Sequence, residues 1–129
     1  MIKVAKFGGS SLANGEQFKK IKNIILEDPS RSIIVVSAPG KKNKDDHKIT
    51  DLLYLIYAHL KYGVDAKNIF DIVKSRYLEI KKTLSLKIDL EKEFTLLEVG
   101  LKQKISEEFL VSRGEYFCAK LLAEYLGYD

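Results

Sequence analysis

A glycine pair directly after the first apolar segment constrains the fold most strongly. The segment Ile2–Phe7 is typical of a β-strand, the turn Gly8–Ser11 (Gly-Gly-Ser-Ser) follows it, and a helical pattern runs from about Asn14 to Glu27. Glycine lacks a Cβ atom, so a ligand can approach the backbone closely at such a turn. The amides and the dipole at the start of the following helix favour an anion. Together with the ammonium group of Lys6, this stretch predicts a phosphate-binding turn.

The same turn has a simpler interpretation. It lacks the spacing of the two common glycine-rich phosphate motifs, G-x-x-x-x-G-K-[ST] and G-x-G-x-x-G. A tight connection in which Ser10, Ser11 or Asn14 caps the helix would use the same residues. On the turn alone, both interpretations stay open.

A second strand is predicted from residue 32 to residue 37. It contains the β-branched run Ile33–Val36. This run does not alternate with polar residues, which is typical of a strand buried on both faces of a parallel sheet. Two parallel strands joined by a helix form a βαβ unit, which is expected to be right-handed. The predicted fold class is therefore α/β with a parallel sheet.

A helical region is predicted after the polar, lysine-rich segment Ala38–Lys48, which we interpret as a mobile surface loop. The alternative interpretation of this segment is a flap over the site. Apolar periodicity predicts a helix from Thr50, its cap, to Gly63, and further helices at about Asp65–Leu84 and Asp89–Lys104. We expect these helices to form a helical subdomain of about residues 50–110, inserted after the second strand.

The last helix is predicted within Val111–Asp129. We expect Ser112 to cap it, because Glu115 stands three residues later, which is the spacing of a capping box. Gly127 is expected to end it. The chain stops where a third strand would be expected to begin, so we expect a truncated piece of a longer protein.

The charge balance argues against a nucleic-acid partner. The 129 residues include 22 basic and 18 acidic side chains, and the loop lysines are interleaved with acids, as on a solvated surface. The longest apolar run is too short to cross a bilayer, so no membrane partner is expected. The single cysteine, Cys118, is expected to be a buried apolar side chain in a reducing compartment, and we expect a cytoplasmic location.

Four segments, taken in order, resemble one family. They are Lys6–Ser11 (Lys-Phe-Gly-Gly-Ser-Ser), Val35–Ala38 (Val-Val-Ser-Ala), Thr50–Asp51 and Ser112–Glu115 (Ser-Arg-Gly-Glu). The chain, from Lys3 to Asp129, resembles the N-terminal half of the catalytic domain of an aspartokinase, in the amino acid kinase family. The resemblance implies a partial parallel-sheet αβα sandwich of the amino acid kinase type with a helical insert.

The resemblance also implies an activity. ATP, with Mg²⁺, would phosphorylate the β-carboxylate of aspartate to 4-phospho-aspartate, the first step towards lysine, threonine and methionine. The complete enzyme would be a homo-oligomer. The implied roles are catalysis for Lys6; phosphate binding for Lys6, Gly8, Gly9, Ser10 and Ser37; aspartate binding for Thr50 and Glu115; and no metal ligand. The chemistry is consistent, because a carboxylate nucleophile is already ionised and the protein must mainly position two anions.

The sequence departs from the family pattern in several places. Ser10 stands where the family often has threonine, and the loop before Thr50 is longer and richer in lysine than in many relatives. The second half of the family's active site and its regulatory domains have no counterpart in these residues, so the chain alone is expected to be inactive. Two alternatives stay open: another amino acid kinase, acting on glutamate, acetylglutamate or carbamate, and a stand-alone module that binds an anion, a nucleotide or a partner.

Overall fold

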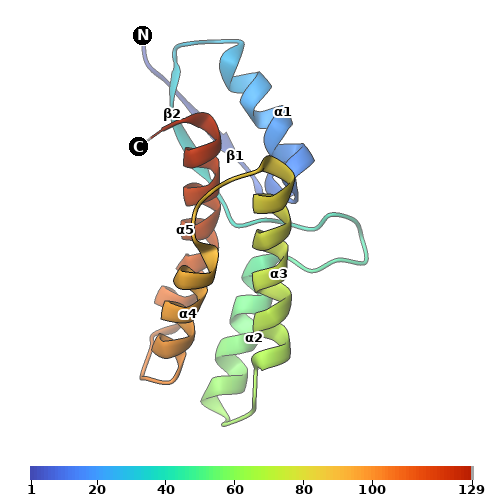
Figure 1. Ribbon diagram of the computed structural model, residues 1–129, viewed down its shortest axis with the longest axis vertical. Coiled ribbons are helices and arrows are strands. Elements are labelled where there is room, and N and C mark those ends of the chain that lie inside the picture. Colours follow the sequence, from blue (N-terminus) through green and yellow to red (C-terminus); the bar gives the residue numbers. More distant parts are fainter. Residues whose placement is uncertain (129) are drawn as a thin grey trace.

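The computed structural model describes residues 1–128 and places a small parallel sheet beside a layer of helices (Figure 1). The elements follow in the order β1 (Lys3–Phe7), the short 3-10 helix η1 (Gly9–Leu12), α1 (Gly15–Leu26), β2 (Arg31–Val36), α2 (Ile49–Lys61), α3 (Lys67–Leu84), α4 (Leu90–Leu101) and α5 (Glu107–Leu126). The predicted α/β class is confirmed. Within residues 1–128, no helix has the length and apolar character that crossing a membrane requires.

The two strands and α1 form the predicted parallel βαβ unit. The strands pair in parallel, and Phe7 lies opposite Val36 at their carboxyl ends. Asn14 caps α1, because its side chain accepts a 3.0 Å hydrogen bond from the amide of Gln17. The buried stripe of α1 consists of Phe18, Ile21 and Ile25. Since both strands run the same way, their carboxyl ends meet at one edge of the sheet.

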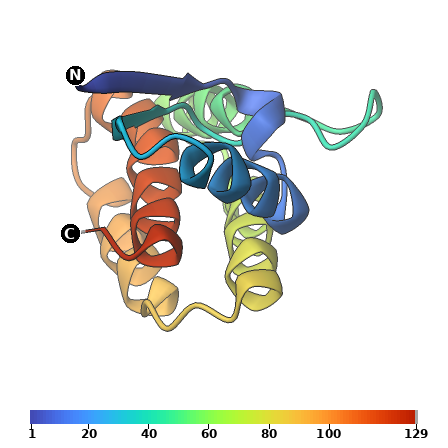
Figure 2. The same cartoon turned by 90° about the horizontal axis from the view of Figure 1, so that it is seen from above.

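One face of the sheet is left uncovered by residues 1–128. Val4, Ile33 and Val35 lie on this face and are 62%, 49% and 42% exposed. The sequence prediction that the second strand is buried on both faces is therefore wrong for the described chain. The physical reason is that the helices lie on one side of the strands only (Figure 2), so alternate strand side chains have no packing partner.

The long helices pack along the long axis of the molecule around an aromatic cluster (Figure 1). The rings of Phe94 and Phe117 lie 4.7 Å apart, and the ring of Tyr77 lies within 6 Å of both. Helices α2 to α4 occupy residues 49–101 and thus fall inside the predicted helical region. Their assignment to a separate subdomain stays a prediction.

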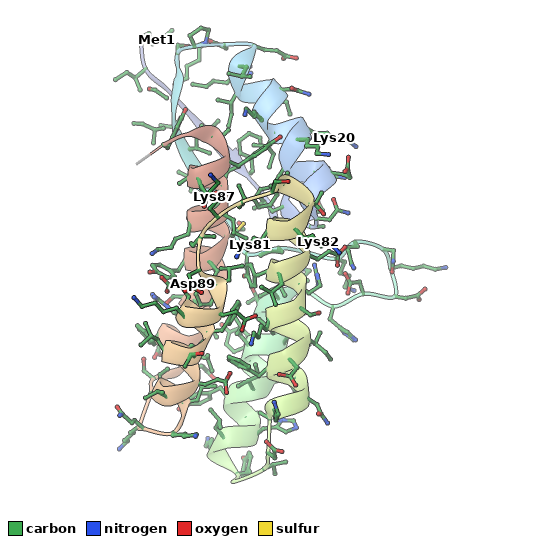
Figure 3. All side chains as sticks on the ribbon, viewed as in Figure 1. Met1, Lys20, Lys81, Lys82, Lys87 and Asp89 are labelled. Carbon is green, nitrogen blue, oxygen red and sulfur yellow. The ribbon has the colours of Figure 1, made fainter. Side chains whose placement is uncertain are left out.

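The connection between α3 and α4 is fastened to α5. The carboxylate of Glu124 accepts hydrogen bonds from the amides of Lys87 (2.7 Å) and Ile88 (2.9 Å). Figure 3 labels Lys87 and Asp89 on this connection, and Asp89 caps α4 by accepting a hydrogen bond from the Lys92 amide. These bonds link the helical region to the end of the chain that runs beside the sheet.

The predicted start of α2 is wrong by two residues, because Lys48 rather than Thr50 takes the cap position. The amide of Ile49 donates a 3.1 Å hydrogen bond to the carbonyl of Pro39, and the helix begins there. Thr50 lies inside the first turn, and Lys48 takes the cap position without a side-chain bond to the helix. The prediction for the end is confirmed, because Gly63 follows the helix with a φ of +70°.

The predicted start of α5 is also wrong. The helix begins at Glu107, and Ser106 caps it by accepting a 3.1 Å hydrogen bond from the amide of Phe109. Two acidic residues follow Ser106 and suit the positive end of the helix dipole. Ser112 therefore lies inside the helix, where its hydroxyl donates to the carbonyl of Phe109 (2.7 Å), and the predicted capping box does not form. Gly127 ends the helix as predicted, with a φ of +76°.

The loop between β2 and α2 is only partly a surface segment. Its first residues, Ala38, Pro39 and Gly40, are buried, which differs from the sequence prediction. They are buried because they pack against the turn after β1 and against α5. The middle of the loop is exposed and projects beside α3 (Figures 1 and 2).

Candidate active site

A cavity of about 570 Å³ opens at the carboxyl ends of β1 and β2. Four parts of the chain meet there: the turn after β1, the loop after β2, the start of α2 and the middle of α5. Its lining consists of Gly9, Ser10, Ser37, Ala38, Pro39, Gly40, Lys41, Lys48, Thr50 and Glu115. This edge is the usual ligand-binding position in open α/β sheets.

The turn after β1 and the loop after β2 touch backbone to backbone. The amide of Gly40 donates a 2.7 Å hydrogen bond to the carbonyl of Gly9. A Cβ atom on Gly40 would lie 2.6 Å from the carbonyl carbon of Gly9 and 2.8 Å from the nitrogen of Ser10, so a side chain at this position would push the loops apart. The two loops therefore form one continuous wall of the cavity.

Glu115 lines the cavity because α5 packs closely against α2 and the loop. Gly114 is the point of closest approach. A Cβ atom there would lie 2.9 Å from the Cβ of Ala38 and 3.2 Å from the Cδ1 of Leu53. The glycine of the Ser-Arg-Gly-Glu segment thus permits the packing, and the next residue supplies a carboxylate to the cavity.

The beginning of α2 contributes hydrogen-bond donors. Lys48 and Thr50 both line the cavity, at the cap position and in the first turn of the helix. The amide of Ile49 already donates to the carbonyl of Pro39, but the next amides of the first turn lack partners within the helix and favour an anion. The hydroxyl of Thr50, the hydroxyls of Ser10 and Ser37, and these amides therefore give the cavity a donor-rich lining opposite the single carboxylate of Glu115.

The cavity also contains two cationic residues that were not among the predicted site residues. Lys41 and Lys48 belong to the loop that was interpreted as solvated surface, yet both line the cavity. Nothing in the run of lysines between residues 41 and 48 distinguishes these two from Lys44, which lies outside the lining. Their positions follow from the buried start of the loop and from the start of α2.

Two predicted site residues lie outside the lining. The side chain of Lys6 is exposed, since Phe7 faces the core and successive strand residues point to opposite faces. Lys6 therefore lies on the uncovered face of the sheet, where it pairs in register with Val35. Gly8 is exposed between β1 and the lining residue Gly9. The structure brings Gly9, Ser10, Ser37, Thr50 and Glu115 together, and the roles of all the predicted residues stay predictions.

Cys118 lies one helical turn beyond Gly114 and is fully buried, as predicted. Burial raises the pKa of its thiol, and the nearby charge of Glu115 adds to this effect. Because the thiolate is the nucleophilic form, this cysteine is suited to packing rather than to catalysis. Among residues 1–128, no three His, Cys, Asp or Glu side chains lie close enough together to hold a metal ion.

Comparison with known proteins identifies the family. The sequence matches the "Amino acid kinase family" over residues 1–128. The chain belongs to the amino acid kinase family. Among curated members, it is 40% identical to aspartokinase 3 of Bacillus subtilis, over 98% of this chain and 29% of that protein.

Solved structures of the family agree with this fold. The aspartate kinase of Clostridium acetobutylicum superposes with a TM-score of 0.91 at 44% identity, over 96% of this chain and 29% of that one. Escherichia coli aspartokinase III, solved in complex with aspartate and ADP, gives a TM-score of 0.76 at 25% identity, over 98% of this chain and 29% of its own. The amino acid kinase fold over these residues is thus confirmed. The chain spans under a third of the length of each of these three relatives.

Proposed function

We propose that the natural gene product that contains these residues is an aspartate kinase. It transfers the terminal phosphoryl group of ATP to the β-carboxylate of aspartate and forms 4-phospho-aspartate. The observation that carries the proposal is the meeting of the Gly9–Ser10 turn with Ser37, Thr50 and Glu115 in one cavity. The likeness to aspartate kinases supports the choice of substrate.

In this proposal, the turn after β1 binds phosphate. The amides of Gly8 and Gly9 and the hydroxyl of Ser10 donate hydrogen bonds to phosphoryl oxygens, and Ser37 lies at the facing strand end. Lys6 neutralises the charge of the transferred group. Its four-carbon stem lets the ammonium group extend around the strand end from the exposed face of the sheet.

The other side of the cavity holds the amino acid. The carboxylate of Glu115 pairs with the ammonium group of aspartate, and the hydroxyl of Thr50 donates to a carboxylate oxygen of the substrate. The pairing selects an α-amino acid, since a ligand without the ammonium group would leave two negative charges facing each other. The aspartate carboxylate attacks phosphorus directly, so no general base is required.

The residues present suit phosphate better than a metal ion. Glu115 is the single carboxylate of the cavity, and the described residues contain no metal-binding cluster. These residues alone therefore do not provide a Mg²⁺ site. The proposal includes Mg²⁺ only as the ion that accompanies the phosphates of ATP. As for its setting, we propose a cytoplasmic homo-oligomer that acts on small molecules.

The test measures acyl-phosphate formation by the full natural gene product, with hydroxylamine to trap the product. We expect turnover with ATP and aspartate and little with glutamate. Glu115→Gln should raise the KM for aspartate, and Lys6→Ala should lower kcat by about 100-fold or more, as expected when a charge-stabilising group is lost. Lys44→Ala, a loop lysine outside the cavity, is the matched control and should resemble the wild type.

Two outcomes would contradict the proposal. Preferred turnover of glutamate, acetylglutamate or carbamate would assign the protein to another activity of the family. Nucleotide binding without turnover of any of these acceptors would favour the binding-module alternative. The Lys6 assignment would be wrong if Lys6→Ala retained nearly normal turnover.

A further inference from the structure

A buried arginine lies behind the wall of the cavity. Arg76, on α3, is 6% exposed, and its guanidinium group faces the loop between β2 and α2. Nη2 donates to the carbonyl of Gly40 (2.7 Å), and Nη1 donates to the carbonyl of His47 (3.0 Å). Nη1 also forms an ion pair with the carboxylate of Asp46 (3.3 Å). One side chain thus holds both ends of a loop whose middle is exposed.

The same guanidinium group also contacts the other loop of the cavity. Nη2 lies 3.4 Å from the carbonyl of Ala13, which follows η1. Arg76 thus contacts the carbonyls of Ala13 and Gly40, one in each loop. The two loops are joined by the 2.7 Å hydrogen bond from Gly40 to Gly9. Arg76 therefore holds the chain on both sides of the glycine contact, although it does not line the cavity itself.

We propose that Arg76 is a positioning residue that fixes the Gly9–Ser10 turn against Gly40 and thereby sets the geometry for phosphate binding. This inference rests on the proposed function. Arginine suits the task because its planar fork offers several donors in fixed directions. Lysine would keep the charge but, as a compact ammonium group, would not span carbonyls that diverge from one another. A positive charge at this position is therefore insufficient to hold the two loops, and the planar guanidinium group is required.

The test compares Arg76→Lys and Arg76→Met with Lys74→Met in the full natural gene product. Lys74 lies on the same helix but pairs with Glu91 of α4 at 2.6 Å, away from the loop. The first readout is hydrogen exchange at the Gly40 amide, which does not depend on activity. The second readout is the set of kcat and KM values for ATP and aspartate, measured separately.

We expect both Arg76 variants to speed exchange at Gly40 and to lower kcat/KM for ATP by about 10- to 100-fold, the cost of a small misplacement of a reacting group. The KM for aspartate should change much less, because Glu115 is held by the packing of α5. Lys74→Met should change neither readout. Failure of Arg76→Lys to restore ATP kinetics would exclude a role of charge alone.

Unchanged exchange at Gly40 in both Arg76 variants would overturn the inference. Faster exchange with wild-type ATP kinetics would also overturn it, since Arg76 would then only stabilise the loop. A wild-type protein without kinase activity would refute the proposed function instead, and the exchange data would still report whether the arginine holds the loop.

If the Arg76 variants do not fold, Gly40→Ala tests the same wall by another route. Its Cβ atom would lie within 3 Å of backbone atoms of Gly9 and Ser10, so the loops must separate. The expected result is again a loss in kcat/KM for ATP that exceeds any change in the KM for aspartate. Normal ATP kinetics in a folded Gly40→Ala protein would overturn the inference.

Discussion

The buried hydroxyl of Tyr77 donates a 2.7 Å hydrogen bond to the backbone carbonyl of Gly114. This bond joins α3 to α5 at the residue that precedes Glu115. Burial raises the pKa of Tyr77, so the hydroxyl stays protonated and remains a donor over the physiological pH range. The aromatic core therefore fixes the position of α5 along its axis, and with it the position of the Glu115 carboxylate in the cavity.

Removal of this hydroxyl should weaken the fold. We expect Tyr77→Phe to lower the free energy of unfolding by about 1 kcal/mol, the usual net value of one hydrogen bond. Urea denaturation of the 129-residue chain measures the effect. Tyr62→Phe is the matched control, because Tyr62 is 76% exposed. Equal stability of the two variants would contradict the importance of the bond.

Gly114→Ala should be destabilising although alanine favours helices. Its methyl group would lie 2.9 Å from the Cβ of Ala38, a contact that must be relieved by moving α5, at a cost of about 1–3 kcal/mol. Gly100→Ala in α4 should have the opposite effect, a gain of about 0.5–1 kcal/mol, because within residues 1–128 no atom beyond the neighbouring helix backbone lies within 4 Å of the new methyl group. Thermal unfolding of both variants checks the pair. Stabilisation by Gly114→Ala would show that α5 does not pack as described.

The stabilising effect of Asp46 should depend on pH. Partial burial raises its pKa, but hydrogen bonds from the amides of Lys42 and His47 and the charge of Arg76 outweigh this and lower the pKa overall. A carboxyl whose pKa is lower in the folded state favours folding above its unfolded pKa of about 3.9. Its contribution is lost as the pH falls through the lowered value.

Denaturation of the wild type and Asp46→Asn at several pH values tests this expectation. The wild type should be more stable at pH 7, and the difference should shrink as the pH falls below about 4. A difference that stays constant across this range would mean that the carboxylate charge is unimportant for the loop.

The uncovered sheet face should drive self-association of the 129-residue chain. Val4, Ile33 and Val35 form a contiguous exposed apolar surface, and such surfaces promote association. We expect Ile33→Lys to shift sedimentation velocity profiles towards the monomer. Tyr62→Lys adds the same charge at an exposed site elsewhere and should have little effect. Equal association in both variants would exclude the sheet face as the contact.

The sequence was most informative where one short segment decides the structure. Asn14, one of the three predicted cap candidates, caps α1, and the Gly-Gly-Ser-Ser turn follows its strand as expected, since both features depend on neighbouring residues. The predicted start at Thr50 was wrong because a distant partner, the carbonyl of Pro39, competes with the local cap. Pro39, whose carbonyl accepts the hydrogen bond from the Ile49 amide, lies ten residues earlier in the sequence. The predicted start at Ser112 was wrong because another serine, Ser106, caps the helix six residues earlier.

The site followed the same rule. Residues in motifs, such as Ser37 and Glu115, line the cavity, and the roles that the resemblance implied for them stay predictions. Arg76 had no signal in the sequence, because its partners are mostly backbone carbonyls, which every residue carries, and they lie up to 63 positions away. Only the fold brings them to one side chain.

The buried side chain of Cys118 provides a natural probe of local unfolding in the wild-type chain. It is the single cysteine of the sequence, and it lies on α5 close to the residue that supplies the cavity carboxylate. A thiol reagent can therefore modify the protein only when α5 opens locally, and the labelling rate counts those openings without any engineered probe. Comparison of this rate with and without ATP or aspartate would measure how firmly each ligand closes the molecule around its site.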